Sequence, residues 1–245
     1  MVAFISLLTF NSLLPFNGGY KNRMPDKVRE DQYDGPYVHY TGDEILVNYI
    51  MVTNGEKIVK KESIPLQQKD NLSLKVMTDI PSKSFQVQLK KSLQTEKSEF
   101  DKVKKLLVLS DIEGNFGALR KLLLANKVID EDLQWKFGDG NLVLIGDFFD
   151  RGQQVTEVLW LIYYLEEKAK TAGGYVHFIL GNHEIMNLSG DLRYLNTKYS
   201  DNAKLLDQNY MSLYDEHSEL GRWLRTKNVV EKIGDIMFAH GGISA

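Results

Sequence analysis

The chain has 245 residues, and its 30 Lys and Arg residues against 33 Asp and Glu residues give a formal net charge of −3. Hydrophobic residues make up 43% and charged residues 26% of the chain, which is typical of a globular protein and excludes a disordered polymer, a coiled coil and a multi-span membrane protein. This charge balance lacks the basic excess of nucleic-acid-binding proteins, so no nucleic-acid partner is expected. The sequence has no cysteine, which excludes thiolate metal sites, disulfides and cysteine nucleophiles.

Residues 1–16 are mostly apolar and allow two interpretations. The stretch is too short to span a membrane but suits the core of a signal or anchor segment, although no Lys or Arg precedes it. An exported or periplasmic protein, with membrane association through this segment, is one expectation. A cytoplasmic protein with a buried N-terminal strand or helix is the other. Residues 17–35 are polar and contain glycine, which predicts a linker.

Residues 36–90 alternate apolar and polar side chains, as half-buried strands do. The alternation is clearest from Ile45 to Met51, and Asn54-Gly55 then supplies a hairpin turn signal. Further alternating runs at 72–76 and 85–89 bring the expected total to four or five antiparallel strands. The sequence therefore predicts a small all-β module for packing or partner docking, followed by a charged linker over 91–105.

After Lys105 the pattern changes to short apolar runs separated by segments with helical spacing. The runs suited to buried strands are residues 106–109, 142–145, 176–180 and 236–239. Helical spacing covers residues 116–127 and 155–170 and parts of 203–227. This alternation predicts an α/β domain over 106–245, with βαβ units and a largely buried sheet.

Each of the four apolar runs ends in a small polar group with glycine beside it. The groups are Ser110-Asp111-Ile112-Glu113-Gly114-Asn115, Gly146-Asp147-Phe148-Phe149-Asp150-Arg151-Gly152, Gly181-Asn182-His183-Glu184 and His240-Gly241-Gly242. Ligands bind outside the carboxyl ends of strands in open α/β sheets, so these groups should converge on one crevice. One such Asp or Asn alone is usually a helix cap. Four together, rich in carboxylate, amide and imidazole ligands, predict a divalent metal site.

These segments resemble the calcineurin-like metallophosphoesterase superfamily, whose motifs run Asp-x-His, Gly-Asp-x-x-Asp-Arg-Gly, Gly-Asn-His-Glu and a later His-Gly-Gly. GDFFDRG at 146–152 and GNHE at 181–184 point to its phosphoprotein phosphatase branch. The runs GNHEIMNLSGDLRYL from Gly181, GRWLR at 221–225 and AHGGIS at 239–244 are similar to the bacterial Shewanella-like phosphatases. The resemblance covers about Lys105 to Ala245 and implies an α+β sandwich of layered β-sheets flanked by helices.

The resemblance also implies a centre with two divalent metal ions, which could be Mn, Fe, Zn or Mg. Asp111 and Asp147 would bind the first metal, and Asp147 would bridge to the second. Asn182 and His240 would bind the second metal, whose site is one ligand short in this sequence. A carboxylate can bridge two cations, and an amide oxygen adds coordination without adding charge.

Three further residues receive catalytic roles from the resemblance. His183 would be the general acid, Asp150 would orient it, and Arg151 would hold the phosphoryl oxygens, which its guanidinium matches bidentately. The implied reaction is hydrolysis of a phosphomonoester, on a phosphoprotein or phosphopeptide, by a metal-bound hydroxide. A dinucleoside polyphosphate or another small phosphate ester is the alternative substrate. A degenerate phosphate-binding surface protein is an alternative of another class.

Two features depart from the family pattern. Glu113 stands where the family usually has His. It would either replace that imidazole as a ligand of the first metal, which the i, i+2 spacing from Asp111 in an extended segment favours, or cap the helix expected near Asn115. The sequence also stops at Ala245, whereas the family continues with further strands and one more metal-binding His, so an incomplete C-terminal part is expected.

Overall fold

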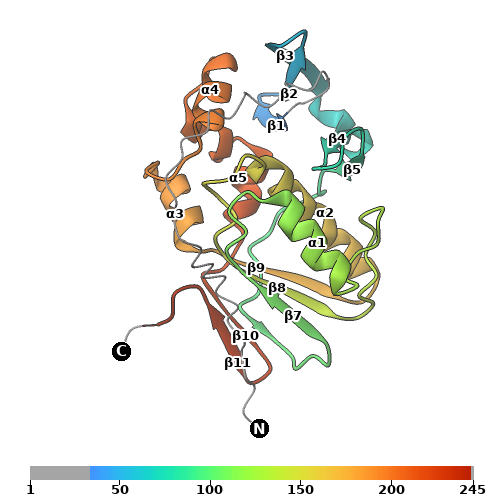
Figure 1. Cartoon of the computed structure of the whole chain (residues 1–245). Coiled ribbons are helices and arrows are strands. Elements are labelled where there is room, and N and C mark those ends of the chain that lie inside the picture. The colour runs from blue at the N-terminus through green and yellow to red at the C-terminus, as the bar shows by residue number, and fades with distance from the viewer. Residues whose placement is uncertain (1–33, 244–245) are drawn as a thin grey trace, which may run out of the picture.

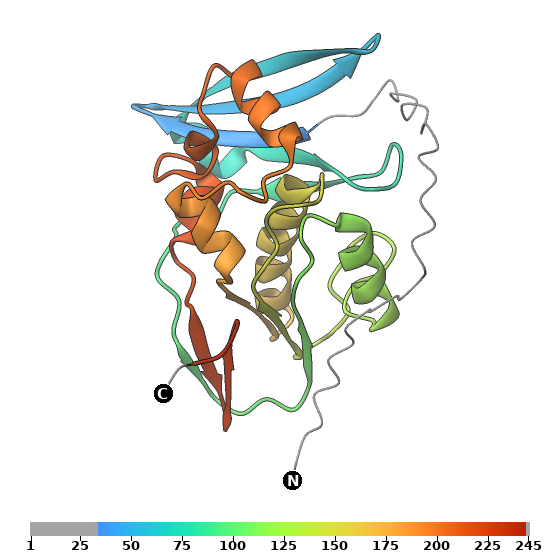
Figure 2. The same ribbon diagram turned by 60° about the vertical axis from the view of Figure 1, so that its left-hand side comes forward.

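The computed structural model describes residues 34–243 as a stack of layers (Figure 1). From one side to the other these are a small sheet near the C-terminus, a parallel sheet, a layer of helices, and a β-rich layer built by the first strands of the described chain (Figures 1 and 2). The predicted segment 1–16 lies outside the described residues, as does most of the predicted linker 17–35, whose last two residues open the first strand.

Predicted elements between residues 106 and 180 lie within two residues of their observed bounds. The strands are β1 (Asp34–Thr41), β2 (Glu44–Thr53), β3 (Glu56–Pro65), β4 (Ser73–Met77), β5 (Ser84–Gln88), β6 (Glu99–Phe100), β7 (Leu106–Leu109), β8 (Asn141–Ile145), β9 (Tyr175–Ile179), β10 (Val230–Ile233) and β11 (Ile236–Ala239). The helices are α1 (Phe116–Ala125), α2 (Val155–Thr171), α3 (Asn182–Ser189), α4 (Thr197–Leu205) and α5 (Glu219–Leu224), with two 3-10 helices, η1 (Leu66–Asn71) and η2 (Tyr210–Tyr214). Within 34–243, each helix is too short or too polar to cross a lipid bilayer.

The central layer is a parallel sheet in the order β7-β8-β9, and the residues of β8 alternate between its two faces. Leu142 and Leu144 pack in the main core with α1 and α2, whereas Val143 and Ile145 pack against residues of β10 and β11. A strand covered on both faces has a continuous apolar sequence, which is why the run LVLI predicts it. The parallel arrangement brings the carboxyl ends of all three strands to one edge of the sheet.

The run 236–239 forms β11, which does not join the parallel sheet. It pairs antiparallel with β10, and β10 pairs in parallel with β6, giving a separate sheet in the order β11-β10-β6. Ile236 is 46% and Met237 58% exposed, so the expectation of a buried strand is wrong for this run. β6 falls inside the predicted linker 91–105, since a strand of two residues has no periodicity that could predict it.

Strands β1 to β5 form two antiparallel sheets, β1-β2-β3 and β4-β5, whose core is continuous with that of the parallel sheet. They cover the side of α2 that faces away from β7–β9 (Figure 2). Residues 158–165 of α2 are all buried, and Trp160 Nε1 donates to the carbonyl oxygen of Pro36 at 2.9 Å. A helix that is apolar all round must be covered on every side. Strands β1 to β5 therefore bury the apolar side chains of α2 that the parallel sheet does not contact.

Candidate active site

The loops that follow β7 and β8 adopt left-handed backbone conformations at several non-glycine residues. The φ angle is +56° at Asp111 and +48° at Glu113 after β7, and +63°, +67° and +54° at Asp147, Asp150 and Arg151 after β8. Such residues cost about 1–3 kcal/mol each and cluster where a site constrains its side chains. The two loops hold each other, because the Glu113 N–H donates to the Asp147 carbonyl oxygen at 2.9 Å.

Two glycines allow the loop after β8 to touch the start of α3. A Cβ on Gly146 would lie 2.4 Å from the Cα of Gly181, and a Cβ on Gly181 would lie 2.3 Å from Asp147 Oδ1. The first clash is with backbone, so no side-chain movement could relieve it. Glycine at both positions therefore lets Asp147 reach the first turn of α3, where the His183 N–H donates to Asp147 Oδ1 at 3.0 Å.

Side chains from three strand ends meet at this edge of the sheet. Asp111, Asp147 and His240 each place one ligand atom within 4.8 Å of the others. Asn182 joins them, with its Oδ1 3.0 Å from His240 Nε2. The segments that the sequence predicts to converge are brought together, including the one from β11, which reaches the site from the second sheet.

The hydrogen bonds of His240 test whether this group fits a cation. His240 Nδ1 lies 2.8 Å from the carbonyl oxygen of Ile145, which can only accept, so the proton of a neutral ring sits on Nδ1. Nε2 then presents a lone pair, and it lies 3.1 Å from Asp147 Oδ2 and 3.0 Å from Asn182 Oδ1. When the ring is neutral, three electron-pair donors therefore face one another. A divalent cation satisfies all three, so the residues fit a metal site.

His183 lies beside this group and is 4% exposed. Its Nδ1 is 2.6 Å from Asp150 Oδ2, and its Nε2 is 3.9 Å from Asp147 Oδ2. The Asp150 carboxylate accepts from Nδ1–H, which fixes the ring and leaves Nε2 turned towards the ligand group. The other oxygen of Asp150 is buried without a hydrogen-bond partner in the described part of the chain. This is the geometry of an imidazole held in place by a carboxylate, as the sequence predicts for the pair.

Glu184 has a structural role that its sequence motif alone did not reveal. Its fully buried carboxylate accepts from the backbone N–H groups of Asp147 at 2.8 Å, Phe148 at 2.7 Å and Gly181 at 2.7 Å. Burial raises the pKa of this carboxyl above its ordinary value, and the three N–H groups oppose that rise. Glu184 thus ties the turn after β8 to the turn after β9. The only feature of the sequence that could have indicated this role is the Glu in the motif GNHE.

Arg151 and Glu113 form an ion pair, with Nη1 and Oε1 2.6 Å apart. Glu113 does not belong to the group of three whose ligand atoms lie within 4.8 Å. The extended segment assumed for the i, i+2 argument is wrong, because Asp111 and Glu113 both have positive φ. The capping alternative is also wrong, since α1 is capped by Asn115, whose Oδ1 accepts from the Ala118 N–H at 3.0 Å. Ligation by Glu113 stays a prediction.

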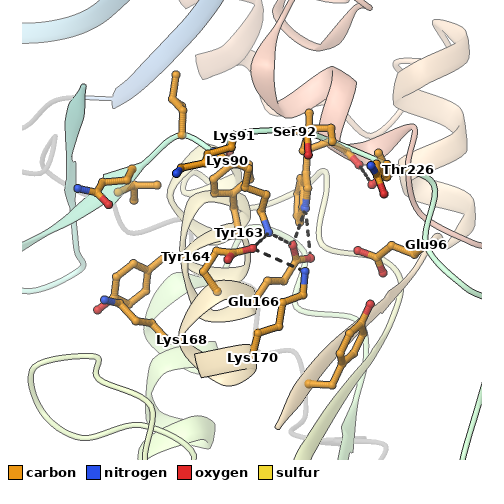
Figure 3. Close-up of a pocket in the computed structure, with 18 of the residues that line it drawn as sticks. Lys90, Lys91, Ser92, Glu96, Tyr163, Tyr164, Glu166, Lys168, Lys170 and Thr226 are labelled. Carbon is orange, nitrogen blue, oxygen red and sulfur yellow. Dashed lines mark hydrogen bonds and ion pairs between the residues drawn. The ribbon is translucent and has the colours of Figure 1, made fainter. Parts of the chain in front are cut away.

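A cavity of about 1450 Å³ opens elsewhere, along the C-terminal half of α2 and the segment that follows β5 (Figure 3). It is lined by none of the predicted site residues. Figure 3 shows Lys90 and Glu166 meeting at its wall, where their Nζ and Oε2 atoms lie 2.5 Å apart. Glu166 also accepts from Lys227 Nζ at 2.5 Å, so buried opposite charges are paired here. The chemistry-bearing residues lie at the carboxyl edge of the sheet, away from this cavity.

The fold has layered sheets with helices between them. Its candidate site combines carboxylate, amide and imidazole ligands with a histidine held by a carboxylate and with an arginine. Together these features are typical of a metallophosphoesterase. The chain belongs to the calcineurin-like phosphoesterase family, whose model matches residues 104–244. Members of this family use divalent metal ions, and Asp111, Asp147 and His240 form a candidate ligand group for such ions. The family resemblance drawn from the motifs is confirmed.

Individual relatives agree with this assignment. The crystal structure of a cold-active protein-tyrosine phosphatase of a psychrophile, Shewanella sp., superposes with a TM-score of 0.75 at 38% identity, covering 87% of this chain and 62% of that chain. Shewanella-like protein phosphatase 1 of Plasmodium berghei is 29% identical over 170 residues, 66% of this chain and 46% of the relative. A symmetrical bis(5'-nucleosyl)-tetraphosphatase of Tolumonas auensis is 31% identical over 139 residues, 56% of this chain and 43% of the relative. The predicted fold class is confirmed, and the chain spans less than half the length of these two curated relatives.

Proposed function

We propose that this chain carries the catalytic residues of a divalent-metal-dependent phosphatase that hydrolyses phosphomonoesters on proteins or peptides. One observation carries the proposal. The ligand group of Asp111, Asp147 and His240 lies beside the His183–Asp150 pair, at the same edge of the sheet as Arg151. Cation ligands, a proton donor and a guanidinium each supply a group that can lower the barrier to phosphoryl transfer to water.

Asp111, Asp147, Asn182 and His240 would hold the metal ions. When bound, the ions would neutralise charge on the phosphoryl oxygens and make the attacking water more acidic. Carboxylate, amide and imidazole ligands suit Mn, Fe, Zn or Mg, and we propose a pair of such ions. Ile145 supports this arrangement by fixing the ring of His240 through its carbonyl oxygen, so that Nε2 faces Asp147 and Asn182.

The remaining residues bind the ester and move a proton. The Arg151 side chain is 56% exposed and can turn its guanidinium to two phosphoryl oxygens at once. His183 Nε2 would donate a proton to the departing oxygen, because Asp150 holds the ring through Nδ1 and leaves Nε2 turned towards the ligand group. Asp147 accepts from the His183 N–H, so the proton donor and the metal ligands keep a fixed separation.

The test compares three substrates on the 245-residue chain with Mn²⁺ added: a phosphopeptide, a nitrophenyl phosphate and diadenosine tetraphosphate. We expect phosphate release from the phosphopeptide and from the nitrophenyl phosphate, with loss of both on chelation. Bound metal without turnover of any ester would contradict the proposal and support the phosphate-binding alternative. Metal content, measured on the same preparation, separates that outcome from a chain that binds no metal at all.

A second candidate substrate is a dinucleoside polyphosphate. The similarity to a symmetrical bis(5'-nucleosyl)-tetraphosphatase favours it, because that relative matches over more than half of this chain. The chemistry of attack would be the same, and the leaving group would be a nucleotide. Faster hydrolysis of diadenosine tetraphosphate than of phosphopeptides would favour this candidate over the first.

A further inference from the structure

Tyr194 is a large aromatic side chain at the edge of the site, and this residue is 46% exposed. Its ring centroid lies 5.2 Å from that of His183, with the planes inclined at 57°. The guanidinium carbon of Arg151 lies 5.6 Å from the same ring. Exposure of a single tyrosine is ordinary. Its position next to both the proposed proton donor and the proposed phosphoryl-binding arginine places it where a substrate would bind.

Tyr194 contacts Arg151 and a neighbouring residue of its own loop, Arg193. The Arg151 N–H donates to the Tyr194 carbonyl oxygen at 3.1 Å, which ties the loop to the residue that binds the ester. Arg193 lies 5.9 Å from the ring centroid, and its guanidinium is fixed by Asp191, with Nη2 2.7 Å from Oδ2. Both guanidinium groups therefore lie within about 6 Å of the ring, a distance at which each attracts its face. One part of its surface still faces solvent.

The leaving group of the ester must pass close to this ring. In the proposed reaction His183 protonates the departing oxygen, so the atoms bonded to that oxygen lie against the His183 ring. Tyr194 borders that position at a ring separation of 5.2 Å. An aromatic leaving group could therefore stack on Tyr194 at the roughly 4.5–7 Å spacing that aromatic pairs prefer, whereas the alkyl group of serine offers no π face.

We propose that Tyr194 is a specificity-determining residue that favours phosphotyrosine over phosphoserine by stacking on the phenyl ring of the leaving group. The proposal rests on the proposed phosphatase function and adds to it the residue that selects an aryl ester. An aromatic pair of this kind corresponds to about a 2- to 10-fold preference.

Two variants and two matched peptides test the proposal. The peptides share one sequence and differ only in carrying phosphotyrosine or phosphoserine. In Tyr194→Leu, the ratio of kcat/KM for the phosphotyrosine peptide over the phosphoserine peptide should fall by about 2- to 10-fold, mainly through KM. Tyr194→Phe keeps the ring and should keep the ratio. Thermal unfolding of both variants checks that each is folded.

An unchanged ratio in Tyr194→Leu, with both peptides still hydrolysed, would overturn the role of Tyr194 and leave the phosphatase function standing. Equal losses on both peptides would also overturn it, because they would show that the ring only supports Arg151 or His183. If the unaltered chain hydrolyses neither peptide, the proposed function fails. Binding of the corresponding tyrosine and serine phosphonate peptides then tests Tyr194 without catalysis: a ratio of Kd values that Tyr194→Leu does not change, or no binding at all, would overturn its role.

Discussion

Glu113 Oε1 lies 2.6 Å from Arg151 Nη1, so the side chain expected to bind a metal forms an ion pair with the side chain expected to bind the ester. The Glu113 side chain is 21% and the Arg151 side chain 56% exposed, so this pair lies at the rim of the site. A carboxylate at this position competes with a phosphoryl group for one guanidinium.

Replacing Glu113 by Gln should therefore tighten the binding of phosphate esters. A partly exposed ion pair is worth up to about 1 kcal/mol, so KM and the inhibition constant of inorganic phosphate should fall by about 2- to 5-fold. An unchanged Mn²⁺ concentration for half-maximal activity would assign Glu113 to the ion pair with Arg151, outside the ligand group of Asp111, Asp147 and His240. A higher Mn²⁺ requirement in Glu113→Gln would instead support metal ligation by Glu113.

Replacing Asp147 by Asn should abolish metal-dependent activity and weaken metal binding. Asp147 contributes to the ligand group and lies 3.1 Å from His240 Nε2, so losing its charge removes the central anion of the site. In the unaltered chain, metal at about 100 times its Kd should add roughly 2.7 kcal/mol to the free energy of unfolding. The Asn variant should lack most of this gain. Melting curves with and without Mn²⁺ measure it independently of catalysis, and an equal gain in both proteins would contradict the assignment.

His183→Asn should lower kcat by about 10²- to 10⁴-fold on a phosphoserine peptide, because a proton donor is lost at the departing alkoxide. The loss should be much smaller for nitrophenyl phosphate, whose leaving group needs little protonation. Metal content should remain close to that of the unaltered chain, since the His183 side chain is held by Asp150 and its hydrogen bond to Asp147 comes from the backbone N–H, which Asn keeps. Equal losses on both esters would argue against proton donation by this residue.

The stability of the chain should depend on pH through Glu157, which is buried in α2. Burial raises the pKa of its carboxyl from 4.5 to about 8, against the opposing effect of the Lys198 ammonium 3.9 Å away. Between those values the folded chain keeps a proton that the unfolded chain releases, so the free energy of unfolding falls as the pH rises from about 4.5 to about 8. Glu157→Gln should be more stable than the unaltered chain at about pH 8.5, by on the order of a few kcal/mol, and similar to it near pH 4.5.

Urea unfolding at both pH values measures this difference. Glu167→Gln is a matched control on the same helix, because the side chain of Glu167 is 55% exposed and should produce no such pH-dependent gain. A stability difference between Glu157→Gln and the unaltered chain that does not change with pH would show that the Glu157 carboxyl has the same pKa in the folded and the unfolded chain, and would contradict the prediction.

The sequence predicted which segments meet at the candidate site, because each of them is a short run with its own signature. A polar group with glycine beside it marks the end of an apolar strand, and Asp147, Asn182 and His240 all have this context. That pattern does not indicate whether a residue has a negative or a positive φ angle. The left-handed φ at Asp111 and Glu113 depends on the neighbouring loop, so the direction of the Glu113 side chain could not be predicted from its spacing alone.

Contacts between distant segments account for the other differences. In the sequence alone, Tyr194 is indistinguishable from a tyrosine that packs in the core. Only the fold shows that its loop lies beside Arg151. The run at 236–239 has the composition of a buried strand, but β11 lies at the edge of its sheet among the described residues. A sequence pattern gives the apolar face of an element. It does not say how much of that face another element covers.

The burial of α2 on all sides has a consequence for where this protein can be divided. The family model begins at residue 104, but the structural similarity to the Shewanella phosphatase covers 87% of the chain. A chain shortened to begin at Leu106 would expose the apolar face of α2 on which β1 to β5 pack, including Trp160. Such a chain should precipitate instead of serving as a minimal catalytic unit. The start of the family match thus marks where shared sequence begins, whereas the cooperative folding unit extends back to β1.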